Sequence, residues 1–235
     1  MTETKLYIIR HGKTMFNTIG RTQGWSDTPL TAEGEEVIHQ LGVGLKGVAF
    51  EEAYSSDSGR AMQTARIILQ EHTHGEQLPY RTDKRIREWC FGSLDGGYDG
   101  ELWGVVPRIL AFKNYEDMMS KSITYEELAS AIMAADTADW AEPYEKIRER
   151  TWNGFEDIAH RREKNGGGNV MIVSHGLTIS FLLSLIDDSL PMQMGLENGS
   201  VTTLLYNNGS FTIDKINDLS YIEAGKKELT EKNLL

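Results

Sequence analysis

Two histidines in this chain follow apolar runs of the same pattern. His11 comes after residues 6–10 (LYIIR), and His175 comes after residues 170–174 (VMIVS). Each is followed by a glycine, which allows the backbone to turn sharply. Such runs predict short strands buried on both faces, and open α/β sheets bind ligands at the carboxyl ends of these strands. We therefore expect the two imidazoles to lie on neighbouring central strands and to face one crevice.

Two arginines are placed to bind an anion beside these histidines. Arg10 adjoins His11, and Arg60 falls in the first turn of a helix predicted to begin after Ser58. A helix N terminus favours anions, so an arginine there is electrostatically unusual. A bound phosphate would resolve the conflict, because the helix dipole and the guanidinium group would then point at the same anion. The alternative is a solvated arginine. Forked guanidinium groups bind phosphoryl oxygens in pairs and stabilise the charge that develops during phosphoryl transfer.

Glu88 is the candidate acid and base. It lies in a glycine-containing stretch, residues 85–97, in which Trp89 and Phe91 are large apolar anchors. A carboxyl group against an apolar wall could hold a proton at neutral pH and give it to a leaving alkoxide, and its carboxylate could then activate water. The alternative is an inert surface ion pair with a neighbouring arginine.

Together these residues predict covalent phosphoryl transfer. A neutral imidazole can attack phosphorus, nearby cations keep it neutral, and a carbonyl bond to its other nitrogen would fix the tautomer. The remaining histidines have no metal-ligand spacing supported by acidic neighbours, so we expect neither a metal nor another cofactor.

The elements that must position these residues alternate between strands and helices, which predicts an α/β fold. Strands are expected over residues 6–9, 48–54 and 170–173, with a weak signal over 76–84 and a hairpin over 201–206 and 211–216. Helices are expected over residues 32–46, after Ser58, over 143–164 and over 177–186. Residues 99–142 carry apolar residues at helical spacing and are expected to form an insertion that caps the site. Residues 223–235 are polar, so we expect a flexible tail.

Composition excludes several classes of partner. With 24 Lys+Arg against 35 Asp+Glu, the net charge is −11, which repels nucleic acid and anionic membranes. Cys90 is the only cysteine, so no intrachain disulfide can form. The 235 residues suit one domain, and no apolar run is long enough for a membrane span. We expect a soluble cytoplasmic protein, monomeric or homodimeric, whose partner is a small phosphorylated metabolite.

The motifs resemble those of the histidine phosphatase superfamily, which has the phosphoglycerate mutase-like fold. The segments that carry the resemblance are residues 10–14 (RHGKT), Asn17, and residues 21–31, 54–65, 87–96 and 174–176. The resemblance implies a three-layer α/β/α sandwich with a mostly parallel central sheet. It implies His11 as the phosphorylated nucleophile, Glu88 as acid and base, and Arg10, Arg60 and His175 as the phosphate pocket. It also implies that Asn17, Gln23 and Gly24 line the substrate. Lys13 departs from the pattern, since the family usually has Glu or Gln there.

The superfamily contains both phosphatases and mutases. In its mutases the glutamate is followed by Arg-His-Tyr-Gly, and a basic cluster lies in the insertion. Here Glu88 precedes Trp-Cys-Phe-Gly, and the insertion has scattered cations at Arg108, Lys113 and Lys121. Gln23 before Gly24 also looks like the broad-specificity phosphatase branch. We therefore favour a metal-independent phosphatase of small monoesters over a 2,3-bisphosphoglycerate-dependent phosphoglycerate mutase. An inactive phosphoryl-binding protein is disfavoured, because the two histidines and Glu88 are present.

Overall fold

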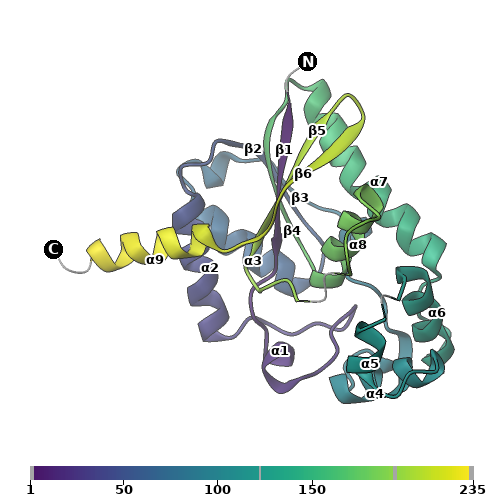
Figure 1. Cartoon of the computed structure of the whole chain (residues 1–235). Coiled ribbons are helices and arrows are strands. Elements are labelled where there is room, and N and C mark those ends of the chain that lie inside the picture. Colours follow the sequence, from purple (N-terminus) through teal and green to yellow (C-terminus); the bar gives the residue numbers. More distant parts are fainter. Residues whose placement is uncertain (1–2, 122, 193–194, 233–235) are drawn as a thin grey trace.

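The centre of the molecule is a six-stranded, mostly parallel sheet (Figure 1). The computed structural model describes residues 3–121, 123–192 and 195–232. The strands lie in the order β3-β2-β4-β1-β5-β6, with β1 to β4 parallel and β5 and β6 antiparallel. Their bounds are β1 Thr4–Arg10, β2 Phe50–Ser55, β3 Tyr80–Thr82, β4 Gly168–Ser174, β5 Val201–Asn207 and β6 Ser210–Asp218. Apart from the short β3, the strands lie within two residues of the positions predicted from the sequence.

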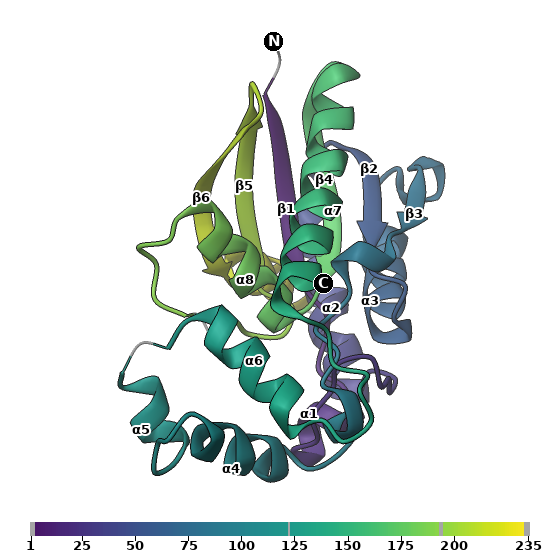
Figure 2. The ribbon, with the colours of Figure 1, turned by 90° about the vertical axis from the view of Figure 1, so that its right-hand side faces the viewer.

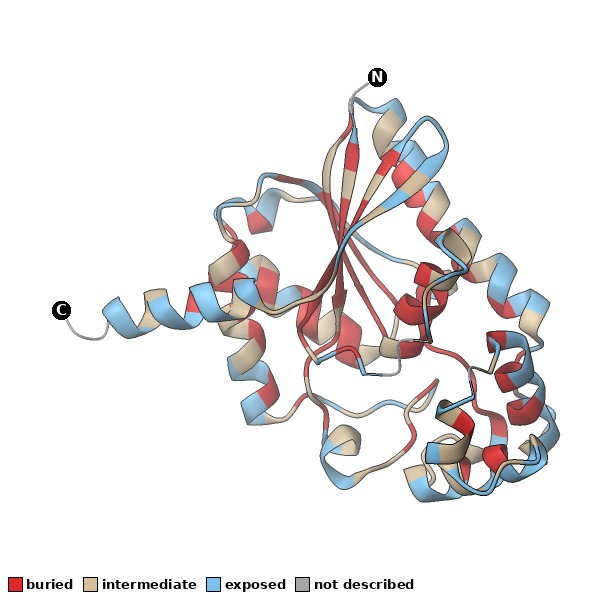
Figure 3. Ribbon diagram, viewed as in Figure 1, coloured by how far each residue is buried: buried red, intermediate tan, exposed pale blue. Residues whose placement is uncertain are grey.

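Helices cover both faces of this sheet, which confirms the three-layer α/β/α architecture (Figures 1 and 2). Helices α2 (Ala32–Leu45) and α3 (Gly59–Glu71) pack on one face, and α7 (Tyr144–Lys164) and α8 (Gly176–Ile186) pack on the other. Successive residues of β1 and β4 point to opposite faces. Leu6, Ile8, Val170 and Ile172 belong to the core on the α7 and α8 side, and Tyr7, Ile9, Met171 and Val173 to the core on the α2 and α3 side. Both central strands are therefore buried on two sides, as their continuous apolar runs predicted (Figure 3).

The register of β1 and β4 brings the two histidines together. The strands are parallel, and Arg10 pairs with Ser174 at their carboxyl ends. The His11 amide then donates to the Ser174 carbonyl at 3.0 Å. Because β1 and β4 are adjacent and parallel, His11 and His175, which follow their last residues, lie side by side at the edge of the sheet. This confirms the expectation of neighbouring strands.

The described residues of segment 99–142, named here the helical insertion, lie beyond the carboxyl ends of the central strands (Figures 1 and 2). They contain α4 (Asp99–Ile109), α5 (Tyr115–Met119) and α6 (Tyr125–Ala135). Their apolar cluster includes Trp89 and Phe91 of the loop that carries Glu88, together with Phe181 of α8. The core of the helical insertion therefore also holds the Glu88 loop in place. The short helix α1 (Met15–Ile19) also lies beyond this end of the strands (Figure 1).

The polar C-terminal stretch forms a helix in the structure. We expected a flexible tail over residues 223–235, but α9 (Ser220–Lys232) packs along α2, and residues 233–235 lie outside the described residues. Glycines permit this contact, since a Cβ on Gly225 would lie 1.8 Å from the Gln40 carbonyl oxygen. A glycine contact leaves no trace in a hydropathy pattern, which is why polarity alone suggested a tail. In the described part of the chain, no helix is both long and apolar enough to cross a membrane.

Candidate active site

His11 is buried just beyond the end of β1, with one ring nitrogen fixed by the backbone. Its Nδ1 lies 2.9 Å from the Gly12 carbonyl oxygen. A carbonyl oxygen only accepts, so Nδ1 carries the proton and Nε2 presents a lone pair. Gly12 is required here, because a Cβ at this position would lie 2.6 Å from Ile38. The backbone therefore fixes the tautomer that a nucleophilic Nε2 needs.

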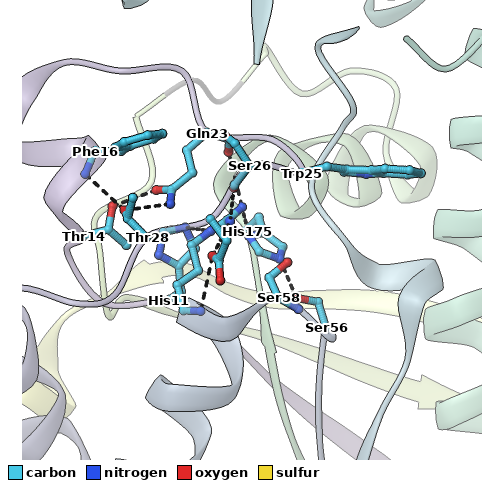
Figure 4. A network of polar contacts seen from close by, with 12 residues as sticks. His11, Thr14, Phe16, Gln23, Trp25, Ser26, Thr28, Ser56, Ser58 and His175 are labelled. Atoms are coloured by element: carbon cyan, nitrogen blue, oxygen red, sulfur yellow. Dashed lines mark hydrogen bonds and ion pairs between the residues drawn. The ribbon is translucent and has the colours of Figure 1, made fainter. Parts of the chain in front are cut away.

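His175 presents the opposite tautomer to the same space. Its Nδ1 accepts from Nη2 of Arg60 at 3.0 Å, because a guanidinium group only donates. Its Nε2 therefore donates to Oγ of Ser56 at 2.6 Å. The two imidazole rings lie 5.2 Å apart between centroids, with Ser56 beyond His175 (Figure 4). Ser56 belongs to residues 54–65, one of the segments that carry the family resemblance, but the sequence alone assigned it no role.

Burial and nearby cations keep both histidines neutral. Burial, followed by the charges of Arg60 and Arg10, holds the pKa of His11 well below its usual value. Burial and Arg60 likewise lower the pKa of His175 well below its usual value. Neutral His11 retains the lone pair on Nε2 across the physiological range, which suits a nucleophile.

Arg60 links both histidines to the loop of residues 23–28. It lies in the first turn of α3 with its side chain fully buried, so it is not a solvated arginine. Nε donates to Nε2 of His11 at 3.3 Å, and Nη1 donates to Oδ1 of Asp27 at 2.9 Å. The carbonyl oxygens of Gln23, Gly24 and Ser26 also accept from this guanidinium group. The loop thus supplies the acceptors that hold Arg60 beside the histidines.

Arg10 has one N–H group without a hydrogen-bond partner among the described residues. Nη1 of its buried guanidinium group donates to the Leu196 carbonyl, whereas its Nε has no hydrogen-bond partner among the described residues. Gly176 packs closely against this side chain, because a Cβ at that position would lie 3.3 Å from Nε. A buried unpartnered N–H of a cation is costly unless an acceptor binds it. The Arg10 Nε therefore suits an oxygen of an anionic ligand.

Glu88 lies at the N terminus of α8, next to the segment that carries His175. Its Oε1 accepts from the amides of Thr178 at 2.9 Å and Trp89 at 3.1 Å, and its Oε2 accepts from the amide of Leu177 at 3.1 Å. The Thr178 hydroxyl lies a further 2.9 Å from Oε1. The sequence suggested an apolar wall around this carboxyl group. The structure surrounds it with N–H donors instead, three of which are backbone amides.

Asn17 is connected to the backbone of His11 by the side chain of a second asparagine, Asn198. Its Oδ1 accepts from the Thr14 amide at 3.2 Å and lies 3.5 Å from Nδ2 of Asn198. The same Nδ2 of Asn198 donates to the His11 carbonyl at 2.9 Å. Asn198 was missed by the sequence analysis, because it lies in a turn whose residues suggest no chemistry.

Gln23 and Gly24 hold the loop in shape. The Gln23 side chain contacts the hydroxyl groups of Thr14 and Thr28 at 2.7 and 3.1 Å (Figure 4). A Cβ on Gly24 would lie 2.2 Å from the Trp89 carbonyl oxygen. These two residues are therefore placed where they shape the loop around Arg60.

Lys13 forms an ion pair at the surface of the protein. Its Nζ pairs with Oε2 of Glu33 in the first turn of α2 at 2.9 Å, and both side chains are exposed. Such surface pairs contribute little to stability. The departure at position 13 therefore places an ammonium group on the surface rather than in the site.

The fold and this site belong to a known class of protein. A family model described as histidine phosphatase superfamily (branch 1) matches residues 6–219, and the chain belongs to that superfamily.

Relatives of this chain include proteins named as mutases and as phosphatases. A phosphoglycerate mutase structure from Bacillus anthracis str. Sterne is 38% identical with a TM-score of 0.91, over 96% of this chain and 97% of that one. The "probable phosphoglycerate mutase GpmB" of Salmonella choleraesuis (strain SC-B67) is 28% identical over 230 residues, 94% of this chain and 95% of that protein. The alpha-ribazole phosphatase structure from Shigella flexneri is 25% identical with a TM-score of 0.67, over 92% of this chain and 97% of that one.

Proposed function

We propose that this protein is a phosphatase that hydrolyses small phosphate monoesters through a phosphohistidine on His11. One observation carries the proposal: the Nδ1 bond to the Gly12 carbonyl leaves the buried, neutral His11 with its lone pair on Nε2. Two guanidinium groups lie beside it, and that of Arg10 has an N–H without a partner among the described residues. A nucleophile next to an anion pocket suits attack on phosphorus.

In the first step, Nε2 of His11 attacks phosphorus and the ester P–O bond breaks. Protonated Glu88 gives its proton to the leaving oxygen, so the product is a neutral alcohol. Arg60 exchanges its contact with Nε2 for a phosphoryl oxygen, and Arg10 binds another. The two cations stabilise the charge on the equatorial oxygens, so the step needs no metal.

In the second step, water attacks the phosphohistidine. The Glu88 carboxylate takes a proton from the water, the P–N bond breaks, and inorganic phosphate leaves. His11 returns to its neutral form with the proton still on Nδ1, and Glu88 is again protonated for the next first step. The backbone amides at the start of α8 support this role, because they fix the position of the carboxyl group.

Hydrolysis is preferred to mutase chemistry because of the charges on the helical insertion. A mutase of phosphoglycerates must also hold a carboxylate, which calls for further cations at the site. Arg108, Lys113 and Lys121 are all exposed, and Lys121 already pairs with Asp117. The second candidate is a phosphoglycerate mutase, which the names of the Bacillus anthracis and Salmonella relatives favour.

One assay set separates these activities. Turnover of p-nitrophenyl phosphate that survives a chelator, with an acid-labile phosphoenzyme absent from His11→Ala, supports the phosphatase. Conversion of 3- to 2-phosphoglycerate in the presence of 2,3-bisphosphoglycerate, without release of phosphate, would show the mutase. Activity in neither assay would leave a phosphoryl-binding protein, and full turnover by His11→Ala would overturn the mechanism.

We further propose that the chain forms one domain, with the helical insertion as a cap over the site. Its partner would be a small phosphorylated metabolite in the cytoplasm, and the protein would work as a monomer or homodimer. The net charge of −11 supports a small molecule over nucleic acid, because the phosphate site depends on a local pair of cations.

A further inference from the structure

Arg150 holds the backbone of the segment that carries Glu88. It lies on α7, and its guanidinium group contacts three carbonyl oxygens of residues 85–88. Nη1 donates to Arg85 at 2.9 Å and to Arg87 at 2.8 Å, and Nη2 donates to Glu88 at 3.0 Å. This segment begins within the short 3-10 turn Lys84–Ile86 and lies outside the sheet, so its carbonyl groups need such a donor.

Glu142 completes the coordination of Arg150. Its two carboxylate oxygens accept from Nε at 2.9 and 3.2 Å, and its Oε2 accepts from Nη2 at 2.7 Å. Both side chains are shielded from solvent, with 11% of Arg150 and 2% of Glu142 exposed. Every N–H of the guanidinium group is engaged, and the carboxylate neutralises a charge that would be costly to bury alone.

Glu88 is therefore held both by its backbone carbonyl and by its side-chain carboxyl group. Its carbonyl oxygen accepts from Arg150 and, at 3.0 Å, from Nε1 of Trp25. Its carboxylate binds the amides of Leu177 and Thr178 at the start of α8. Because the backbone is fixed, any shift of Arg150 would move the carboxyl group relative to the site. A misplacement of about 1 Å can slow an enzyme reaction about a hundredfold.

Glu142 also ties this arrangement to the helical insertion. It is the last residue of that insertion, and Oδ1 of Asp136 accepts from the Ser93 amide at 2.7 Å. The exit of the insertion is thus bonded to the Glu88 loop directly through Asp136, and indirectly through Glu142, whose partner Arg150 binds the Glu88 carbonyl. The insertion and the Glu88 loop are therefore built as one connected unit.

We propose that Arg150, with Glu142 as its counter-ion, is the positioning residue for proton transfer by Glu88. This inference rests on the proposed function, since it assigns to Arg150 a role in that reaction. Arg150 touches no reacting atom; it sets where the Glu88 carboxyl group stands when the leaving oxygen needs its proton.

The test is a leaving-group comparison with Arg150→Lys, which keeps the charge but replaces the fork with one ammonium group. A good leaving group needs little protonation, whereas an alkoxide needs a full proton. We expect kcat/KM to fall about tenfold or more for β-glycerophosphate and less than about threefold for p-nitrophenyl phosphate. The control is Arg148→Lys on the same helix, where the arginine is exposed and pairs with Glu145; both rates should stay unchanged. Equal losses on the two esters would overturn the inference.

A second comparison uses Glu88→Gln as background. If Arg150 acts through Glu88, Arg150→Lys should reduce kcat/KM for β-glycerophosphate less than about twofold once Glu88 is replaced. The same loss in both backgrounds would overturn the inference. Glu142→Gln should reproduce the leaving-group pattern, and it serves in place of Arg150→Lys if that variant does not fold. If neither variant folded, the pair would be a folding requirement and the inference would fail.

The outcome for the proposed function is read separately, from the wild-type protein. If wild-type protein releases no phosphate but converts 3- to 2-phosphoglycerate, the phosphatase proposal fails. The effect of Arg150→Lys is then measured in that conversion, in the wild-type and in the Glu88→Gln backgrounds, because Glu88 would serve the same proton transfers there. A smaller loss in the Glu88→Gln background would still support Arg150 as the positioning residue, and equal losses would overturn it.

Discussion

Asp27 and Arg60 form an ion pair, with 2.9 Å between Oδ1 and Nη1, that holds the guanidinium group between the two histidine rings. The Arg60 side chain is fully buried, while Asp27 is 33% exposed. A buried cation at the start of a helix is unfavourable without a partner. Asp27 is therefore the residue that allows Arg60 to stand at the site before an anion arrives.

We expect Asp27→Asn to reduce kcat/KM about tenfold, because loss of the charge weakens the hydrogen bond by about 1.5 kcal/mol and lets Arg60 shift. The matched control is Asp214→Asn, since Asp214 is also 33% exposed and pairs with Lys5 at the sheet edge. Steady-state kinetics with p-nitrophenyl phosphate would measure both. Wild-type kcat/KM in Asp27→Asn would show that Arg60 is held without this pair.

Stability should fall as the pH drops below about 6.5, where histidines of the unfolded chain become protonated. The pKa of His175 is lowered in the folded protein, so only the unfolded state binds this proton and protonation favours unfolding. The contribution is about 1.4 kcal/mol per pH unit for each such histidine. His175→Gln should therefore reduce the slope of unfolding free energy against pH, measured by urea denaturation between about pH 6 and 5. His74→Gln replaces an exposed histidine and should leave the slope unchanged. An unaltered slope in His175→Gln would contradict the assignment.

Gly24→Ala should destabilise the protein by about 1–3 kcal/mol, because the new methyl group would overlap the Trp89 carbonyl oxygen 2.2 Å away. Activity should fall with it, since the Gly24 carbonyl accepts from Arg60. Gly104→Ala in α4 is the control, because a Cβ there meets no atom within 4 Å. Thermal unfolding would compare the two variants. Equal melting temperatures would show that the loop can move aside.

Lys13→Gln should change kcat/KM less than about twofold, because the exposed pair with Glu33 contributes little. The substitution restores a residue that the family usually has at this position. Kinetics with p-nitrophenyl phosphate at low and high salt would test it. A larger, salt-dependent change would show that the Lys13 charge is felt at His11.

The sheet and the histidine pair could be predicted because their signals are local. A continuous apolar run followed by His-Gly indicates both a buried strand and the point where it ends. The contacts that set the site cannot be read in this way, because their partners lie far apart in sequence. Asp27 lies 33 residues from Arg60, and Asn198 lies 187 residues from His11. An aspartate or an asparagine in a turn does not indicate which distant side chain or backbone group it will contact.

Helix α9 and the Glu88 environment were mispredicted for a related reason. Gly225 and Gly44 let α9 approach α2 by having no side chain, which hydropathy does not record. The aromatic neighbours of Glu88 suggested an apolar wall, but two of the amide donors come from the start of α8, 89 and 90 residues further along the chain. Sequence patterns located the candidate residues, whereas their surroundings depend on tertiary structure.

The strand order has a consequence for how the chain acquires its site during synthesis. β1 is made first, yet its sheet neighbours are β4 and β5, so it has no strand to pair with until residues 168–174 have left the ribosome. β2 likewise waits for β4 on its inner side. His11 and His175 meet only after this last-made parallel strand has entered between the two earlier ones. A chain cut short before β4 would therefore carry the first histidine without a phosphate pocket around it.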